Sequence, residues 1–387
     1  MGRSDVSLES PRYPDEMLWW TPILVKIMRK EDLTLNEAKE AANRLFCLLK
    51  EERAEAQVLV ASFFGGLTVK GVTVDELAGM ASAVDESKLF KFQFDVNEPV
   101  ITGGGTGGDT LKTINVTTPA LIVASAAGAL TIKSAAKAFS SKTGAADLAV
   151  TLGVKVDASP DVVKKCLKEV GTAVWASAGI YPWMEPILKF RNLPIAPVIL
   201  PLISSLRLMI ATSLNPFSVK RQIRGISIPD TEMVARVLSI VGQERALVTI
   251  GYGRSEKIII DELSNLGDSV VSELKHNGEI ETYKIHPEDL GVKLGDPDEV
   301  RAKDTHEENA KVVLKILAGK DRGARRDLVL INAGAVLYLA EKVKDLKDGY
   351  ELACQVLDST DVTRKVEDLV AMSGGDVRRY RSLLSTI

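Results

Sequence analysis

Residues 103–118 read GGGTGGDTLKTINVTT, and this stretch indicates both the fold class and the kind of ligand that the chain can hold. A short apolar run, Pro99–Thr102, precedes it, and Pro119 with an alanine-rich segment follows. The order predicts a strand, a glycine-rich loop and a helix with Thr118 at its N-cap and Pro119 at its first position. Glycine lets backbone N–H groups converge on phosphate oxygens, and a helix N-terminus adds unpaired donors. We therefore expect an anion cradle, with a ligand-free glycine turn as the alternative.

The same stretch carries one carboxylate, Asp109, which needs a reason of its own. A carboxylate beside a phosphate is repulsive unless it accepts hydroxyl groups, meets a cation or braces the loop. Ribose hydroxyls or a bracing role would account for it. The hydroxyls of Thr117 and Thr118 are expected beside the bound phosphate.

A second polar loop follows one helix later. Lys133 falls at an expected strand end, and Ser140–Gly144 reads SSKTG, with Lys137 and Lys142 as further cations. Two such loops can hold two phosphate groups of one substrate, although an ordinary polar connection remains the alternative.

A pair of adjacent carboxylates, Asp261 and Glu262, follows the β-branched run Ile258–Ile260. The pair is therefore expected at the carboxyl end of a strand, the edge at which open parallel sheets bind ligands. Magnesium prefers oxygen ligands and commonly bridges protein carboxylates to substrate phosphates. Taken alone, the pair could equally be a solvated surface feature.

The apolar pattern divides the chain into two kinds of structure. From Asp32 to about Asp95, apolar residues recur at three- and four-residue steps, which predicts a small helical layer. After Glu98, short apolar runs alternate with longer helical ones, which is typical of an α/β domain with a largely parallel sheet. Asn277-Gly278 between two alternating runs predicts a β-hairpin with a type I′ turn.

Composition argues against several classes of partner. The formal net charge is only -3, so neither nucleic acid nor a membrane is an expected partner. Proline and charge interrupt both long apolar stretches, Met17–Met28 and Ala196–Ala211, so they predict packed helix and loop, not membrane spans. Cys47, Cys166 and Cys354 lie far apart in no metal or redox spacing, which suits a reducing compartment and a cytoplasmic location.

The chain has three histidines, His276, His286 and His306, and all fall in expected turn or cap segments away from the two loops. A histidine-based triad or a zinc site is therefore not expected. The glycine loop also lacks the Gly-Lys-Ser/Thr ending of a nucleotide triphosphatase.

In order and spacing, these motifs resemble those of the anthranilate phosphoribosyltransferase family over about residues 30–345. The motifs that carry the resemblance are Gly105–Asp109, Asn115–Thr118, Lys133, Ser140–Gly144 with Asp147, Asn215-Pro216, Asp261–Ser264, Glu307–Ala310 and Arg326–Ala333. The set is specific, although each motif alone is weak.

The resemblance implies a small N-terminal helical domain joined to a large α/β domain with a largely parallel central sheet. Residues 1–95 would form the first, with helices from about 185–212 packing on it. Residues 96–184 and 213–387 would form the second, which binds phosphoribosyl pyrophosphate. The resemblance also implies Mg²⁺, a homodimer formed through the helical part, and transfer of a phosphoribosyl group to anthranilate in tryptophan biosynthesis, with release of pyrophosphate.

The family's site residues can be transferred to matching positions of this chain. The catalytic positions are Lys133, Asp261 and Glu262, and the metal positions are Thr117, where the family usually has serine, Asp261 and Glu262. The donor-binding positions are Gly105, Thr106, Gly107, Gly108, Asp109, Thr113, Asn115, Thr117, Thr118, Lys133, Ser140, Ser141 and Gly144.

The acceptor half departs from the family pattern. After its lysine the family reads His-Gly-Asn-Arg, whereas this chain reads Ser-Ala-Ala-Lys at positions 134–137. A family histidine before proline is Tyr181 here, and the arginines that grip the acceptor carboxylate are missing. Ala136, Lys137, Tyr181 and Arg207 are the acceptor-side candidates, with Arg207 or Lys137 as the replacement for the lost positive charge.

Three functions remain open at this point. The chain could be a phosphoribosyltransferase that acts on anthranilate or on another aromatic amine or nitrogen heterocycle. It could be a nucleoside phosphorylase-like enzyme of related architecture, or a non-catalytic paralogue that binds nucleic acid or a partner. The two loops and the carboxylate pair favour the first.

Overall fold

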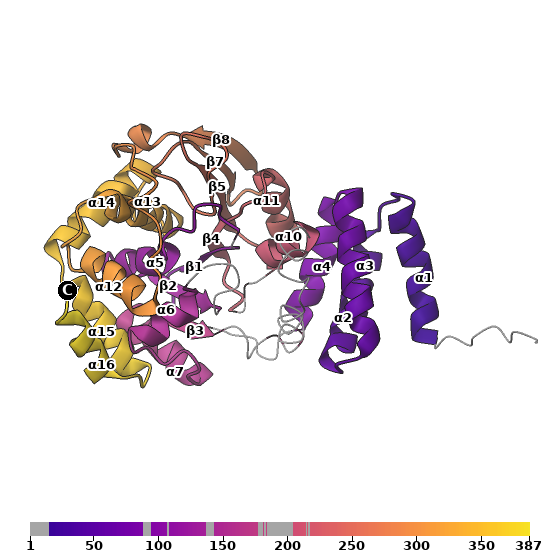
Figure 1. The fold of residues 1–387 in the computed structure, drawn as a ribbon, viewed down its shortest axis with the longest axis horizontal. Coiled ribbons are helices and arrows are strands. Elements are labelled where there is room, and N and C mark those ends of the chain that lie inside the picture. The colour runs from indigo at the N-terminus through magenta and orange to yellow at the C-terminus, as the bar shows by residue number, and fades with distance from the viewer. Residues whose placement is uncertain are drawn as a thin grey trace, which may run out of the picture.

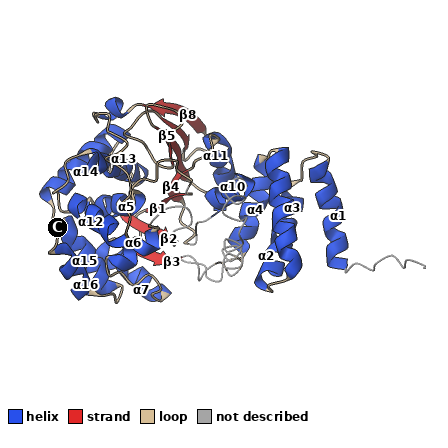
Figure 2. Cartoon of the chain, in the orientation of Figure 1, coloured by secondary structure: helices blue, strands red, loops and turns tan. Residues whose placement is uncertain are grey.

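The computed structural model describes residues 15–87, 94–106, 108–136, 143–176, 181, 183, 204–213, 215 and 217–387. A helical layer lies at one end of the molecule and an α/β body at the other (Figure 1). Figure 2 shows the strands inside the body with helices on both sides. The expected fold class is therefore confirmed.

The helical layer consists of α1 (Asp15–Met28), α2 (Leu35–Lys50), α3 (Ala54–Lys70) and α4 (Val74–Glu86). Two of these helices begin with a capping box, in which a threonine side chain and a glutamate three residues later satisfy each other's backbone N–H groups. The threonines are Thr34 before α2 and Thr73 before α4. From the body, α10 (Ser204–Ser213) packs on α3 and α4.

The body is built on one eight-stranded sheet with the order β3-β2-β1-β4-β5-β7-β8, and β6 pairs with β5 outside this path. Its strands are β1 (Val100–Gly105), β2 (Leu130–Ala135), β3 (Thr172–Ala176), β4 (Arg221–Gly225), β5 (Arg245–Tyr252), β6 (Ile259–Ile260), β7 (Ser269–Leu274) and β8 (Ile280–Ile285). The five strands from β3 to β5 are parallel, and β6, β7 and β8 are antiparallel to their neighbours.

Helices cover the two faces of the sheet (Figure 1). α5 (Thr117–Ala126) and α13 (Ala324–Leu339) pack on each other and on the central strands, and α11 (Thr231–Ile240) packs on β5 and β7 from the other side. Among the described residues, the body also contains α6 (Ala145–Thr151), α7 (Pro160–Lys165) with a π-helical turn at Cys166–Val170, a 3-10 helix at Pro287–Leu290, α12 (His306–Leu317), α14 (Leu346–Ser359), α15 (Val362–Met372) and α16 (Val377–Leu384).

Several local expectations need correction. β1 continues through Gly105 because residues 103–105 pair with residues 223–225 of β4, so three of the quoted glycines lie in a strand and not in a loop. α5 starts at Thr117 with Val116 at its N-cap. Thr118 is therefore not the N-cap, and Pro119 is the third residue of the helix and not the first. The hairpin of β7 and β8 forms as expected, but only Gly278 of the Asn277-Gly278 pair has a positive φ, which excludes a type I′ turn.

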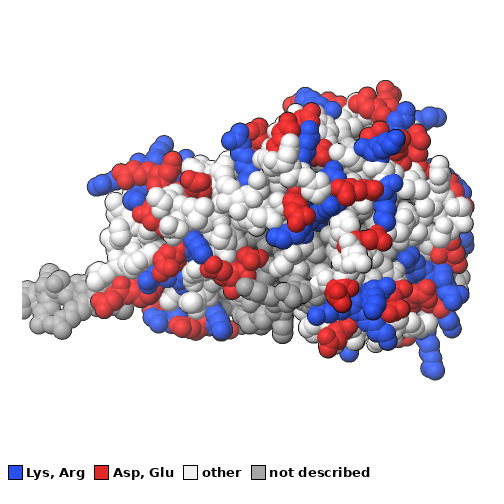
Figure 3. Space-filling view, turned by 180° about the vertical axis from the view of Figure 1, so that it is seen from behind, with Lys and Arg blue, Asp and Glu red and all other residues white. Residues whose placement is uncertain are grey.

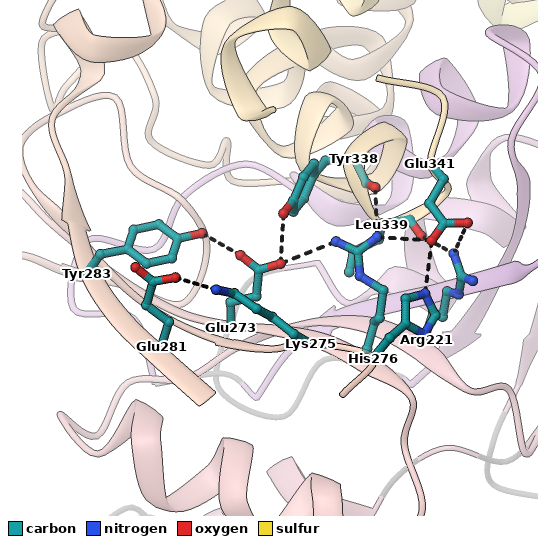
Figure 4. Close-up of polar contacts among 10 residues, drawn as sticks. Arg221, Glu273, Lys275, His276, Glu281, Tyr283, Tyr338, Leu339 and Glu341 are labelled. Carbon is teal, nitrogen blue, oxygen red and sulfur yellow. Dashed lines mark hydrogen bonds and ion pairs between the residues drawn. The ribbon is translucent and has the colours of Figure 1, made fainter. Parts of the chain in front are cut away.

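A buried polar network joins the amino ends of β4 and β5 to the C-terminus of α13 (Figure 4). The Glu273 carboxylate accepts hydrogen bonds from Arg245 at 3.2 Å, from the Tyr338 hydroxyl at 2.8 Å and from the Tyr283 hydroxyl at 3.1 Å. Arg221 donates to the Leu339 carbonyl at 2.9 Å, as suits a cation at a helix C-terminus. The network fixes the edge of the sheet opposite to the glycines of β1.

On the face shown in Figure 3, basic and acidic side chains are interspersed over the α/β body. Among the described residues, no helix is both long and apolar enough to cross a bilayer.

Candidate functional site

The candidate site lies at the carboxyl ends of the parallel strands β1, β2 and β4, the usual ligand edge of such a sheet. Glycine is required at two positions here because Asp261 approaches both strands closely. A Cβ atom on Gly105 would stand 2.6 Å from the Cγ atom of Asp261, and one on Gly225 would overlap the Asp261 backbone. Gly105 and Gly225 therefore leave the space that Asp261 occupies.

The three expected metal residues come together. Asp261 and Glu262 directly follow β6, and the Thr117 hydroxyl at the start of α5 donates to Glu262 at 3.4 Å. All three line one cavity of about 10 Å³, together with Gly104. Burial raises the pKa of Glu262 well above its usual value, and the charges of Asp261 and Asp109 raise it further. The buried site thus disfavours ionisation of Glu262 on its own, and a bound cation would offset that cost.

The donor set fits a hard cation. Glu262 Oε2 is buried and has no hydrogen-bond partner among the described residues, and the oxygens of Thr117 and Asp261 lie beside it. Within the described part of the chain, no group of three or more His, Cys, Asp or Glu residues could hold a metal ion by itself. Mg²⁺ commonly takes only one or two protein carboxylates and completes its octahedron with water and substrate phosphate.

Lys133 belongs to β2 and is buried, with its ammonium group donating to the Ser134 carbonyl at 2.9 Å. Burial, and next the nearby Arg224 charge, lower the pKa of Lys133 to about 8. Arg224 of β4 is buried as well, and burial lowers its pKa to about 10. Sequence reasoning missed Arg224, although an arginine between Ile223 and Gly225, followed by Ile226, is the signal that could have revealed it.

The first loop, which follows β1 and runs from Thr106 to Val116, is held by hydrogen bonds within itself and to the end of β4. Asp109 accepts the Thr113 N–H at 2.9 Å, so the carboxylate braces the loop, which was one of its two expected roles. The Thr106 N–H donates to the Gly225 carbonyl at 3.1 Å. Thr118 is buried, and its hydroxyl has no hydrogen-bond partner in the described part of the chain. Gly107 lies outside the described residues.

The second loop is described only at its end, since Lys137, Ser140 and Ser141 lie outside the described residues. Gly144 is the N-cap of α6, and its N–H donates to Asp147 at 2.9 Å. Asn115 of the first loop donates to the Thr143 carbonyl at 3.1 Å. The two loops are therefore in direct contact.

One expectation about histidine is wrong. His306 does not lie away from the loops, because its Nδ1 atom is 3.0 Å from the Thr143 hydroxyl oxygen. The buried Asn309 side chain donates to the same oxygen at 3.0 Å. The N-terminus of α12 thus holds the end of the second loop, a tertiary contact between segments far apart in sequence.

The acceptor-side candidates lie in different places. Ala136 is exposed just after β2, and Tyr181 is fully buried, with a hydroxyl that has no hydrogen-bond partner among the described residues. Burial raises the pKa of Tyr181. Arg207 of α10 donates to the Ser227 hydroxyl and reaches the position of a Cβ atom on Gly108, so it lies against the first loop.

Comparisons with known proteins identify the family to which the two parts of the chain are similar. The model of the glycosyl transferase family a/b domain matches residues 97–362, and that of its helical bundle domain matches residues 21–88. The anthranilate phosphoribosyltransferase of Desulfosudis oleivorans is 34% identical over 349 residues, which are 90% of this chain and 96% of that protein.

Solved structures agree with the sequence comparison. Anthranilate phosphoribosyltransferase from Thermus thermophilus superposes with a TM-score of 0.76 at 29% identity, covering 91% of this chain and 99% of that one. The Saccharomyces cerevisiae enzyme in complex with PRPP and Mg shares the fold, with a TM-score of 0.76 at 22% identity over 92% of this chain and 99% of that one. The chain therefore belongs to the anthranilate phosphoribosyltransferase family, within the glycosyl transferases built from a helical bundle domain and an a/b domain.

Proposed function

We propose that this protein transfers the phosphoribosyl group of phosphoribosyl pyrophosphate to an aromatic amine, with anthranilate as the acceptor and pyrophosphate as the leaving group. The observation that carries the proposal is the convergence of Thr117, Asp261, Glu262 and Lys133 on the glycines of β1. The name of the Desulfosudis oleivorans relative supports the choice of reaction.

The donor is proposed to lie between the two loops. Backbone N–H groups of the first loop, the N-terminus of α5 and the loop ending at Gly144 would hold its phosphate groups. Thr117, Asp261 and Glu262 would hold Mg²⁺, which supplies positive charge to the pyrophosphate group. The Saccharomyces cerevisiae enzyme was solved in complex with PRPP and Mg, which supports this choice of metal for the family.

In the reaction, the bond between ribose C1 and the pyrophosphate oxygen breaks, and its electron pair leaves with pyrophosphate. The amine nitrogen forms the new bond to C1 and afterwards loses a proton to solvent. Lys133 and the loop N–H groups stabilise the charge that develops on the leaving group. An aromatic amine can lose its proton late, so the chain needs no strong base at this point.

The acceptor site is the part in which this chain differs from its family. Ala136, Lys137, Tyr181 and Arg207 remain the proposed acceptor-side residues, and a different aromatic amine or heterocycle is the second candidate acceptor. The small, uncharged side chain of Ala136, just after β2, offers no charge to an acceptor carboxylate, which favours the second candidate acceptor.

Residues 1–95, with α10 packed on them, are proposed as the helical domain, and residues 96–184 and 213–387 as the donor-binding domain. A homodimer is proposed through the helical layer. Five large apolar side chains are exposed on the neighbouring helices α1 and α3, and exposed apolar patches mark association surfaces. They are Leu18, Val25 and Met28 of α1 with Val58 and Val69 of α3.

Pyrophosphate release tests the proposed reaction. The purified chain is incubated with phosphoribosyl pyrophosphate, Mg²⁺ and anthranilate, and then with other aromatic amines and nucleobases. Release that requires both Mg²⁺ and an aromatic amine is expected. Donor binding without release in any mixture would favour a non-catalytic paralogue, and phosphate-dependent cleavage of a nucleoside would favour the phosphorylase.

A further inference from the structure

Two buried cationic groups converge on one point above Gly104. A Cβ atom on Gly104 would lie 3.1 Å from the Lys133 ammonium nitrogen and 3.6 Å from Arg224 Nη1. No other atom of the described residues comes within 4 Å of that point, apart from Gly104 itself and its chain neighbours. The absence of a side chain at position 104 therefore leaves a space that faces two positive charges.

The sheet fixes the direction of Arg224. Gly104 and Arg224 are register partners in β1 and β4, so both face the same side of the sheet. Gln222, two residues earlier on β4, accepts Arg224 Nε at 3.2 Å and Nη2 at 2.9 Å through its Oε1 atom. The Gln222 side-chain amide in turn donates to Gln243 at 2.9 Å, which locks its orientation. Arg224 Nη1 is the guanidinium nitrogen that comes within 4 Å of the Cβ position of Gly104.

The point above Gly104 lies at the edge of the candidate site. The backbone of Gly104 lines the cavity that contains Thr117, Asp261 and Glu262, which lies on the Ile223 face of the strands, whereas the Cβ direction of Gly104 points to the opposite, Arg224 face at the same strand end. The charges of Asp261 and Glu262 act on Lys133, although less strongly than burial and Arg224 do. Two like charges that are buried side by side repel each other, and a bound anion between them would remove that cost. Arginine and lysine donors in such a place bind oxyanions through charge-assisted hydrogen bonds.

We propose that Lys133 and Arg224 form an oxyanion subsite above Gly104, which binds an anionic oxygen group of a substrate. The chemistry is shared by two sources, the pyrophosphate of the donor and the carboxylate of an acidic aromatic acceptor. Naming these two substrates rests on the proposed function, whereas the proposal that Lys133 and Arg224 bind an anion rests on their positions alone. Arg224 is the new member of this subsite, since Lys133 is already proposed to stabilise the leaving group.

Three variants test the subsite. Arg224→Gln keeps length and polarity but removes the charge, and Arg224→Lys restores the charge without the planar guanidinium. Gly104→Ala keeps both cations and places a methyl group in the proposed space, at a residue whose φ is not positive. Circular dichroism and the melting temperature establish that each variant is folded.

The first arm measures the affinity of inorganic pyrophosphate with Mg²⁺, and of phosphoribosyl pyrophosphate, by calorimetry. The second arm compares KM for anthranilate with KM for aniline, which lacks the carboxylate. In Arg224→Gln and Gly104→Ala, we expect either the affinity for pyrophosphate and the donor or the KM preference for anthranilate to fall about 10-fold or more. This is the usual size of a lost charge-assisted hydrogen bond. Arg224→Lys is expected to retain part of the binding. Loss in the first arm identifies the pyrophosphate, and loss of the preference for anthranilate identifies the carboxylate.

Unchanged pyrophosphate affinity, donor affinity and anthranilate preference in both Arg224→Gln and Gly104→Ala would overturn the proposal. If Arg224→Gln does not fold, the binding measurements on Gly104→Ala test the proposal instead, since this variant keeps both cationic side chains. Pyrophosphate binding is measured without any acceptor. A chain that binds pyrophosphate through Arg224 but shows no turnover would therefore refute the proposed function and leave the subsite standing.

Discussion

The carboxylate of Asp261 lies against Gly105, in the space that any larger residue at that position would need for its Cβ atom. This contact joins the end of β6 to the end of β1 and brings the carboxylate pair to the glycine-rich strand. It explains why glycine is needed at position 105 even though this residue belongs to a regular strand.

Gly105→Ala is expected to displace Asp261, since the new methyl group would meet its carboxylate. Calorimetry should show donor affinity in the presence of Mg²⁺ reduced about 10-fold or more, because one hard ligand is misplaced. Gly65→Ala in α3 is the matched control, since a Cβ atom there meets nothing within 4 Å. Equal donor affinities in the two variants would contradict the role of this contact.

The pKa of Lys133 gives the activity a pH dependence. The pKa is lowered to about 8, first by burial and then by Arg224, and only the ammonium form below that pH binds anions well. We expect kcat/KM for the donor to fall as pH rises through about 8. Arg224→Gln removes the like charge, so the fall should move to higher pH. A profile that stays flat to about pH 9 would contradict this role.

The same shift has an effect on stability with the opposite sign. Between about 8 and the ordinary lysine pKa of 10.5, the unfolded chain binds a proton at Lys133 that the folded chain does not. Stability from this group should therefore rise with pH in that window. Urea unfolding of the parent chain and of Lys133→Met at both ends of the window checks the sign.

The network around Glu273 should matter for stability and not for chemistry. Glu273→Ala removes the buried carboxylate partner of Arg245, which keeps only its longer 3.5 Å pair with the half-exposed Glu341, and it removes the acceptor of two tyrosine hydroxyls. The free energy of unfolding is expected to fall by about 3–5 kcal/mol, as for other broken buried pairs. Glu281→Ala, which breaks the exposed pair with Lys275, should cost only about 0–1 kcal/mol. Equal losses in the two variants would contradict the account.

Thr143 should matter through the second loop. Thr143→Val removes the hydroxyl that accepts from Asn309 and pairs with His306, whereas Thr143→Ser keeps it. We expect Thr143→Val to raise KM for the donor about 5–10-fold with a smaller change in kcat, the size expected for one lost buried hydrogen bond. Thr143→Ser should behave like the parent chain. The account fails here if the two variants have the same KM.

The sequence predicted those features that depend on local pattern. The alternation of strands and helices and the carboxylate pair after a β-branched run were both readable from neighbouring residues. It did not predict that β1 runs through Gly105, because that extension depends on pairing with β4, more than 100 residues away. The contact of His306 with Thr143 and the convergence of Arg224 with Lys133 were missed for the same reason.

The central claim is that this chain is a magnesium-dependent phosphoribosyltransferase that uses an aromatic amine. The most direct measurement is the rate of pyrophosphate release from phosphoribosyl pyrophosphate with anthranilate, with and without Mg²⁺, in the parent chain and in Asp261→Ala. The account predicts release that requires Mg²⁺ and anthranilate together and that is lost in Asp261→Ala. No release with anthranilate or any other aromatic amine, from a folded chain with saturating donor, would contradict it.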